Sequence, residues 1–162
     1  MTNIAIIGAG LSGLTAANIL KNYANVTLFE KSRGVSGRMS TRRSEPYYYD
    51  HGAQFIKVRT SEFSDFITPM IKAGIIERWD ARFVEFENKE IIHRRQWGLQ
   101  NPHYVGVPSM NSIAKYLSQE LTVKLSLRVH SMRRKHNKWY LEDDQGNPVG
   151  EYDWVISTIP AE

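Results

Sequence analysis

The chain has 162 residues, of which 41% are hydrophobic, so it is long enough for one sizeable core and short for two. It contains no cysteine, which excludes disulfides, thiolate nucleophiles and cysteine-ligated metals and fits a reducing cytoplasm. The formal net charge of +4 comes largely from clustered basic residues, but no nucleic-acid motif accompanies them. The longest apolar stretch, residues 4–20, is broken by glycine and hydroxyl residues. We therefore expect a cytoplasmic protein that binds neither nucleic acid nor membrane.

The first thirty residues predict a strand, a helix and a second strand. Residues 4–7 are a short apolar run, residues 11–22 carry a helical apolar stripe, and residues 26–29 are apolar again. Gly8, Gly10 and Gly13 follow the first run at the G-x-G-x-x-G spacing. In that motif the glycines permit a tight turn, the close approach of a pyrophosphate and close packing of the helix, in this order.

An acidic residue ends the second predicted strand. Glu30 stands where a carboxylate would accept hydrogen bonds from a ribose hydroxyl. A basic loop follows, in which Gly37 would let the backbone approach a pyrophosphate and Arg38 would offer a forked cation. Arg42 and Arg43 either line the same groove or are exposed without a ligand. The alternative for the whole segment is an ordinary β-α-β unit that binds nothing.

The remaining elements alternate between helices and short strands. Ser61 is expected to cap a helix that runs to about Ala73, with Pro69 kinking or shortening it and Gly74 ending it. Residues 75–92 resemble short strands, and residues 96–108 are rich in loop-forming residues. Beyond them we expect a helix over 109–120, a strand over 122–127, a three-stranded meander over 129–134, 138–142 and 148–152, and a buried strand over 154–159.

Four segments together resemble a known family. Residues 6–13, 30–43, 50–54 and 104–110 are similar to those of bacterial renalase-like, FAD-dependent amine-oxidase-type oxidoreductases. This resemblance implies FAD as the bound dinucleotide. The family usually carries two adjacent glycines before the arginine of the basic loop, whereas this chain has Ser36 at the first position. A positive φ angle would be costly for that serine.

The resemblance also implies where the cofactor binds. The residues after Asp50 would lie near the isoalloxazine ring, and the Val129 backbone would bind adenine. His51 could instead be a packed or capping histidine, and Trp97 with Tyr104 could form an aromatic wall or fill a core. The predicted cofactor-binding residues are Ile7, Gly8, Ala9, Gly10, Leu11, Ser12, Gly13, Glu30, Lys31, Gly37, Arg38, Met39, His51, Gly52, Ala53, Gln54, Phe55, Val129 and Thr158. No catalytic residue is assigned, and the five histidines show no metal-ligand spacing.

The expected fold class is α/β. We expect an incomplete Rossmann-like FAD/NAD(P)-binding domain over residues 1–58 and 121–162, with a parallel sheet and a β-meander crossover. Residues 59–120 would be part of an inserted α+β substrate domain. Because the family's chains are considerably longer, this sequence is expected to be their N-terminal portion.

Three functions remain open from the sequence. The resemblance implies an oxidoreductase that transfers hydride from a small amine or a reduced nicotinamide compound to flavin and then to oxygen. The alternatives are a catalytically incompetent FAD- or NAD(P)-binding module and an NAD(P)-binding protein, since the glycines and Glu30 serve either dinucleotide. Exposed sheet edges would favour a homodimer or poor solubility.

Overall fold

The computed structural model of the chain describes residues 1–96, 98, 100 and 102–160. The chain divides into two compact units, of which the first is Met1–Ser40 with Ala114–Glu162 and the second is Thr41–Ile113. The domain boundaries expected from the sequence, after residues 58 and 120, lie 18 and 7 residues further along the chain than these (58 − 40 and 120 − 113). Each unit is described separately below.

The first unit is built on a four-stranded parallel sheet. Its strands lie in the order β10, β2, β1, β14, and each neighbouring pair is parallel. In the centre, Ala5 pairs with Thr27 on one side and with Val155 on the other. A parallel sheet with a helical crossover confirms the expected α/β class. The strands are β1 (Asn3–Ile7), β2 (Asn25–Phe29), β10 (Thr122–Lys124) and β14 (Trp154–Ser157).

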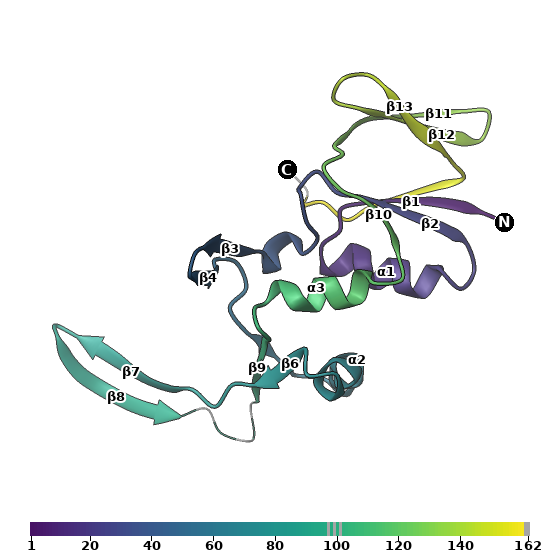
Figure 1. Ribbon diagram of the computed structural model, residues 1–162. Coiled ribbons are helices and arrows are strands. Elements are labelled where there is room, and N and C mark those ends of the chain that lie inside the picture. Colours follow the sequence, from purple (N-terminus) through teal and green to yellow (C-terminus); the bar gives the residue numbers. More distant parts are fainter. Residues whose placement is uncertain (97, 99, 101, 161–162) are drawn as a thin grey trace. The chain divides into compact units, whose positions relative to one another are not determined.

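Different structures cover the two faces of this sheet (Figure 1). Helix α1 (Leu11–Leu20) lies on one face and buries Leu14 and Ala17. The antiparallel meander lies over the other face and confirms the expected three strands. Its strands are β11 (Val129–Lys135), β12 (Lys138–Asp143) and β13 (Pro148–Tyr152).

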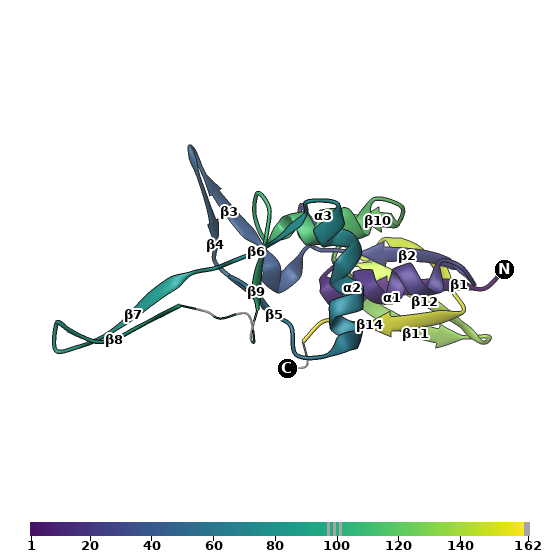
Figure 2. The ribbon, with the colours of Figure 1, turned by 90° about the horizontal axis from the view of Figure 1, so that it is seen from below.

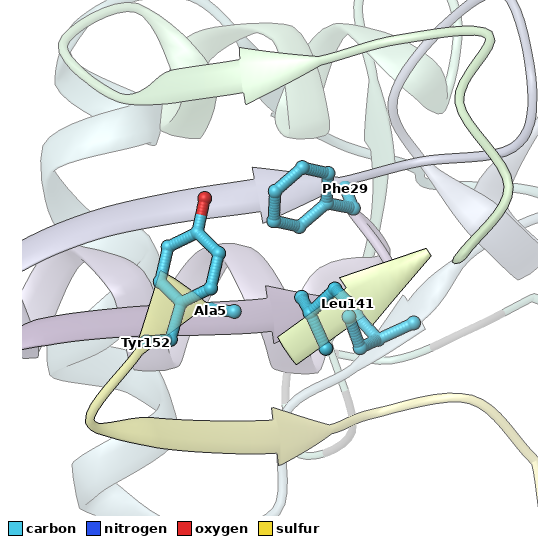
Figure 3. Packing of buried hydrophobic residues seen from close by; sticks show 5 residues of the cluster. Ala5, Phe29, Leu141 and Tyr152 are labelled. Atoms are coloured by element: carbon cyan, nitrogen blue, oxygen red, sulfur yellow. The ribbon is translucent and has the colours of Figure 1, made fainter. Parts of the chain in front are cut away.

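Apolar side chains join the meander to the sheet (Figure 3). Ala5 and Phe29 from the sheet pack with Leu141 and Tyr152 from the meander. The rings of Phe29 and Tyr152 meet edge to face, with centroids 5.8 Å apart. Burial raises the pKa of the Tyr152 hydroxyl. Strand residues alternate between faces, so Leu28, also fully buried, faces the helix side.

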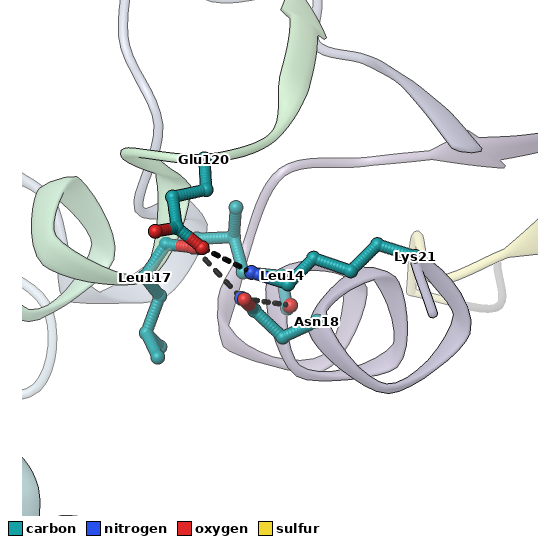
Figure 4. A network of polar contacts seen from close by, with 5 residues as sticks. All are labelled: Leu14, Asn18, Lys21, Leu117 and Glu120. Carbon is teal, nitrogen blue, oxygen red and sulfur yellow. Dashed lines mark hydrogen bonds and ion pairs between the residues drawn. The ribbon is translucent and has the colours of Figure 1, made fainter. Parts of the chain in front are cut away.

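A polar contact joins α1 to the segment that precedes β10 (Figure 4). The Asn18 amide nitrogen donates to the Leu14 carbonyl at 3.0 Å and to the Leu117 carbonyl at 2.7 Å. Lys21 pairs with Glu120 beside it, at 2.7 Å. Leu117 belongs to helix α3 (Asn111–Ser118), so the C-terminal end of α3 packs with the first unit.

The second unit contains two separate β-hairpins and a small three-stranded sheet (Figure 2). The sheet has the order β5, β9, β6 and is antiparallel. A short 3₁₀ helix, Gly37–Met39, precedes this unit in the chain. The elements of the second unit are β3 (Thr41–Ser44), β4 (Tyr47–Asp50), β5 (Ile56–Lys57), α2 (Ser61–Lys72), β6 (Ile76–Arg78), β7 (Arg82–Glu87), β8 (Glu90–Gln96) and β9 (His103–Gly106).

Helix α2 shows how local sequence sets its ends. The cap is Thr60, whose hydroxyl accepts from the Phe63 N–H, so the prediction of Ser61 as the cap was wrong by one residue. The helix continues through Pro69 to Lys72. Ala73 is the C-cap, and Gly74 follows it with φ of +68°. The Ile75 N–H bonds back to the Met70 carbonyl, as in a Schellman motif.

Several predicted bounds need correction. The segment 96–108, predicted to be rich in loops, contains β9, the central strand of its sheet. The helix expected over 109–120 spans Asn111–Ser118. The strand expected over 122–127 ends at Lys124, because Ser126 has φ of +54° and leaves the extended conformation. The strand expected to reach residue 159 ends at Ser157. None of the helices in the described part of the chain is long and apolar enough to cross a membrane.

Replacing Leu141 with alanine should lower the free energy of unfolding by about 2–5 kcal/mol, because it leaves a cavity between the meander and the sheet. Chemical denaturation measures this change. Met132→Ala is the matched control, since Met132 pairs with Leu141 on the same meander but is 46% exposed. Equal losses in the two variants would contradict the packing described here.

The carboxylate of Asp153 should make the free energy of unfolding depend on pH. Its pKa is lowered by the hydrogen bond from the Lys138 ammonium and by the Asn3 N–H. A carboxyl group whose pKa is lowered by folding stabilises the fold at every pH above its pKa in the unfolded chain. This contribution is lost as the pH falls below about 4. We expect Asp153→Asn to be less stable than the original chain at pH 7, with the difference narrowing in acid. A difference that stays constant between pH 7 and pH 2 in thermal melts would contradict this role.

Candidate functional site

A tight glycine turn joins β1 to α1. Gly8 has φ of +104°, and its N–H donates to the Phe29 carbonyl at 2.8 Å. A Cβ on Gly13 would lie only 2.0 Å from the Gly8 carbonyl oxygen. The helix therefore packs directly on the turn, and a side chain at Gly13 would force the two apart.

Gly10 differs from its two neighbours in the motif. Its φ of −78° suits any residue, and a Cβ there would meet only the Gly37 Cα, at 3.9 Å, among the described residues. The packing of the protein thus explains Gly8 and Gly13 but does not require a glycine at position 10. A glycine that the packing does not require, at the N-terminus of a helix, lets a ligand approach the backbone closely.

The start of α1 carries the partial positive charge of the helix dipole. Gly10 is its N-cap without a side-chain hydrogen bond, and the first turn contains no acidic residue. The first bond inside the helix runs from the Leu14 N–H to the Gly10 carbonyl, so the N–H groups of Ser12 and Gly13 precede it. An anion such as a phosphate suits this position.

Glu30 lies beside the turn, immediately after β2. Its side chain is buried, and its two carboxylate oxygens accept from the Ala9 N–H at 3.0 Å and from the Ser32 N–H at 2.9 Å. Its backbone bonds to Lys124 and Leu127, which fixes it from the far side. A carboxylate has about four lone-pair sites, so it can also accept hydroxyl groups of a ligand.

The basic loop returns to the glycine turn. The Ser36 N–H donates to the Ala9 carbonyl at 3.0 Å, and a Cβ on Gly37 would lie 3.2 Å from the Gly10 Cα. Ser36 is buried with φ of +134°, which is the costly conformation for a serine. Met39 is buried beside it, whereas the charged side chains of Lys31 and Arg38 are exposed.

Two further predicted residues belong to this unit. The Thr158 hydroxyl lies 2.9 Å from the Ile7 carbonyl and 3.2 Å from the Gly8 carbonyl. Val129 begins β11 at a bulge and packs against the core cluster. The first unit therefore brings together residues 7–13, Glu30, Lys31, 37–39, Val129 and Thr158, while their cofactor contacts remain predictions.

The other predicted site residues lie in the second unit. His51, Gly52, Ala53, Gln54 and Phe55 are exposed and follow β4. The rings of Phe55 and His103 lie 5.0 Å apart. The place of these five residues near an isoalloxazine ring remains a prediction.

The segment before His51 is fixed at its start. The Asp50 carboxylate accepts from the Thr41 hydroxyl at 2.6 Å and from the Met110 N–H at 3.2 Å. Tyr104 lies in β9 opposite Ile56 and Arg78, and Trp97 falls outside the described residues. Arg42 and Arg43 are exposed in β3. Within the described residues, no group of three or more histidine and acidic side chains could hold a metal ion.

Sequence reasoning missed the partners that fix Glu30. Ser32, Lys124 and Leu127 hold it through backbone atoms, and a backbone N–H or carbonyl leaves no signature in residue type. The only available signal was the placement of Glu30 directly after a strand.

The sequence around the glycine turn is similar to that of known proteins. Residues 6–68 match the family of NAD(P)-binding Rossmann-like domains. The matched residues include the end of β1 and all of α1 and β2, so this part of the chain is similar to a Rossmann-like domain. Mouse (Mus musculus) renalase is 26% identical over 99% of the chain, which covers 48% of renalase. A 4,4'-diapophytoene desaturase of Staphylococcus haemolyticus is 32% identical over 56% of the chain and 16% of its own length.

The structure agrees with the same assignment of fold. A candidate protoporphyrinogen oxidase from Exiguobacterium sp. superimposes with a TM-score of 0.75 at 12% identity, over 99% of this chain and 60% of that protein. The chain thus spans about half of renalase and a smaller share of the desaturase. The Rossmann-like domain places its glycine motif at residues 8–13, between β1 and α1.

Replacing Ser36 with glycine should raise the free energy of unfolding by about 1 kcal/mol, because glycine adopts φ of +134° without strain. Ser40→Gly is the matched control, since Ser40 has φ of −71° and should lose about 0.5–1 kcal/mol. Urea denaturation compares the two. A loss of stability in both variants would contradict strain at Ser36.

Proposed function

We propose that the chain is the dinucleotide-binding portion of an FAD-dependent oxidoreductase of the amine-oxidase or renalase-like type. Similarity to renalase over 99% of the chain supports this proposal. The names of the desaturase and of the protoporphyrinogen oxidase, both redox enzymes, agree with it. When bound, the flavin would accept a hydride from a small amine or a reduced nicotinamide compound and pass the electrons to oxygen.

The observation that carries the proposal is that the packing of the described residues leaves room for a Cβ at Gly10, so the fold itself does not require a glycine there. Gly10 lies beside the uncapped start of α1, and the buried Glu30 carboxylate bonds to the neighbouring residue, Ala9. An adenosine diphosphate group needs these features: backbone N–H groups for the phosphates and a carboxylate for the ribose. The residues present therefore fit the adenosine half of FAD.

Each residue of the chain would bind and orient rather than react. The N–H groups at the start of α1 would bind the pyrophosphate, and Glu30 would accept a ribose hydroxyl. Arg38 is exposed two residues after the buried Ser36, so its guanidinium could contact a phosphate oxygen. The Val129 backbone would meet adenine at the bulge that begins β11.

A second candidate is a binding module without turnover, which would take FAD or NAD(P). The matched family is one of NAD(P)-binding domains, and the glycine turn with Glu30 serves either dinucleotide. The basic loop favours FAD, because its Gly37-Arg38 pair belongs to the resemblance to flavin enzymes and has no counterpart in a simple NAD fingerprint.

Spectroscopy of the purified chain, combined with titration, separates these functions. Retention or uptake of FAD with its visible flavin absorbance supports the FAD proposal. Bleaching of that absorbance under anaerobic conditions by a small amine or a reduced nicotinamide compound, and its return with oxygen, supports the oxidoreductase. Binding of FAD without bleaching favours the module, and tighter binding of NADH or NADPH than of FAD contradicts the flavin assignment.

Replacing Glu30 with glutamine should weaken ADP binding by about 1–3 kcal/mol, because the carboxylate is expected to accept a ribose hydroxyl. Isothermal titration calorimetry with ADP measures the change. Glu120→Gln is the control, since Glu120 is exposed and pairs with Lys21. Unchanged affinity in Glu30→Gln would reject the ribose role.

A further inference from the structure

One peptide group of the glycine turn is held from both sides. The Gly8 carbonyl faces the Thr158 hydroxyl at 3.2 Å, and the N–H of the next residue, Ala9, donates to Glu30 at 3.0 Å. These two groups belong to the same peptide unit. In a trans peptide the C=O and N–H point in opposite directions, so Thr158 and Glu30 hold the unit from opposite sides.

Thr158 reaches this position because of the sheet topology. Ile7 pairs with Ser157 at the carboxyl ends of β1 and β14, so the next residue of each strand, Gly8 and Thr158, leaves the sheet at the same place. The Thr158 N–H continues the ladder by donating to the Ile7 carbonyl at 3.0 Å. Its hydroxyl is shared between the Ile7 and Gly8 carbonyls.

The hydroxyl also occupies the space in front of two motif glycines. A Cβ on Gly8 would lie 2.8 Å from the Thr158 Oγ1, and a Cβ on Gly13 would lie 3.0 Å from it. Thr158 is therefore part of the packing that makes glycine necessary at both positions. Its hydroxyl proton is directed to the backbone of the turn.

We propose that Thr158 is a positioning residue that fixes the glycine turn and, through the Gly8–Ala9 peptide, the Glu30 carboxylate. The hydroxyl orients the peptide, and the peptide N–H orients the carboxylate. Thr158 thus acts on the nucleotide through the turn, where the sequence predicted a direct cofactor contact. The ligand in this inference rests on the proposed function, whereas the coupling between Thr158 and Glu30 does not.

Thr158→Val tests this role, because valine keeps the shape and removes the hydroxyl. In the ligand-free protein we expect the Ala9 amide to exchange its hydrogen about three to ten times faster, as loss of one hydrogen bond predicts. We expect the dissociation constant for ADP to rise by a similar factor. Thr158→Ser keeps the hydroxyl and should restore both values. Thr122→Val, the same change at an exposed position of β10, should alter neither.

The coupling to Glu30 has its own readout. In the Glu30→Gln background, Thr158→Val should weaken ADP binding by a smaller factor than in the original chain. The reason is that Glu30→Gln has already altered the hydrogen bond between the Ala9 N–H and the side chain of residue 30. Effects that multiply independently would overturn the coupling. Unchanged Ala9 exchange in Thr158→Val, or equal effects of valine and serine, would overturn the role of the hydroxyl.

These measurements distinguish failure of the proposed function from failure of the proposed role of Thr158. If the original chain binds no ADP or FAD, the proposed function fails, while amide exchange in the ligand-free protein still decides the role of Thr158. If Thr158→Val does not fold, Thr158→Ser and Thr158→Ala replace it, since they differ by one oxygen atom. Equal Ala9 exchange in that pair would overturn the proposal, and faster exchange in the alanine variant would support it.

Discussion

The close approach of α1 to the end of β1 is the constraint on which the first unit depends. With a Cβ at Gly13 only 2.0 Å from the Gly8 carbonyl oxygen, the helix can lie on the turn only if that side chain is absent. The approach aims the start of α1 at the carboxyl edge of the parallel sheet. There Glu30 and Thr158, from the two strands beside β1, reach the same peptide group. Helix dipole, carboxylate and hydroxyl meet because three neighbouring strands end together.

The sequence predicted this unit well because its signals are local and mutually consistent. The apolar runs of β1 and β2, the glycine spacing and the position of Glu30 each indicate the same β-α-β unit, and the meander follows from turn residues such as Gly146, with φ of +80°. The residue types required at a turn or a buried strand can be recognised without knowing their partners. Agreement among several such signals is what made the fold class predictable.

The second unit was harder to predict, for a physical reason. Strand β9 is short and lies between Pro102 and Pro108, and it is a strand because β5 and β6 pair with it from distant parts of the chain. The hairpin of β3 and β4 has mostly exposed side chains, so no buried face imposes an alternating pattern. In the site, the sequence indicated that Thr158 matters but gave no hint that its hydroxyl bonds to the turn. Such a bond depends on the register of β1 with β14.

The hydrogen bonds around the glycine turn have a thermodynamic consequence. Backbone groups of Gly8 and Ala9 are bonded within the chain to Phe29, Glu30, Ser36 and Thr158. The turn therefore has little conformational freedom left to lose, and a molecule that binds there would meet a preorganised surface. Little of its binding free energy would be lost in ordering the turn. The conformational entropy of the turn is lost largely when the chain folds.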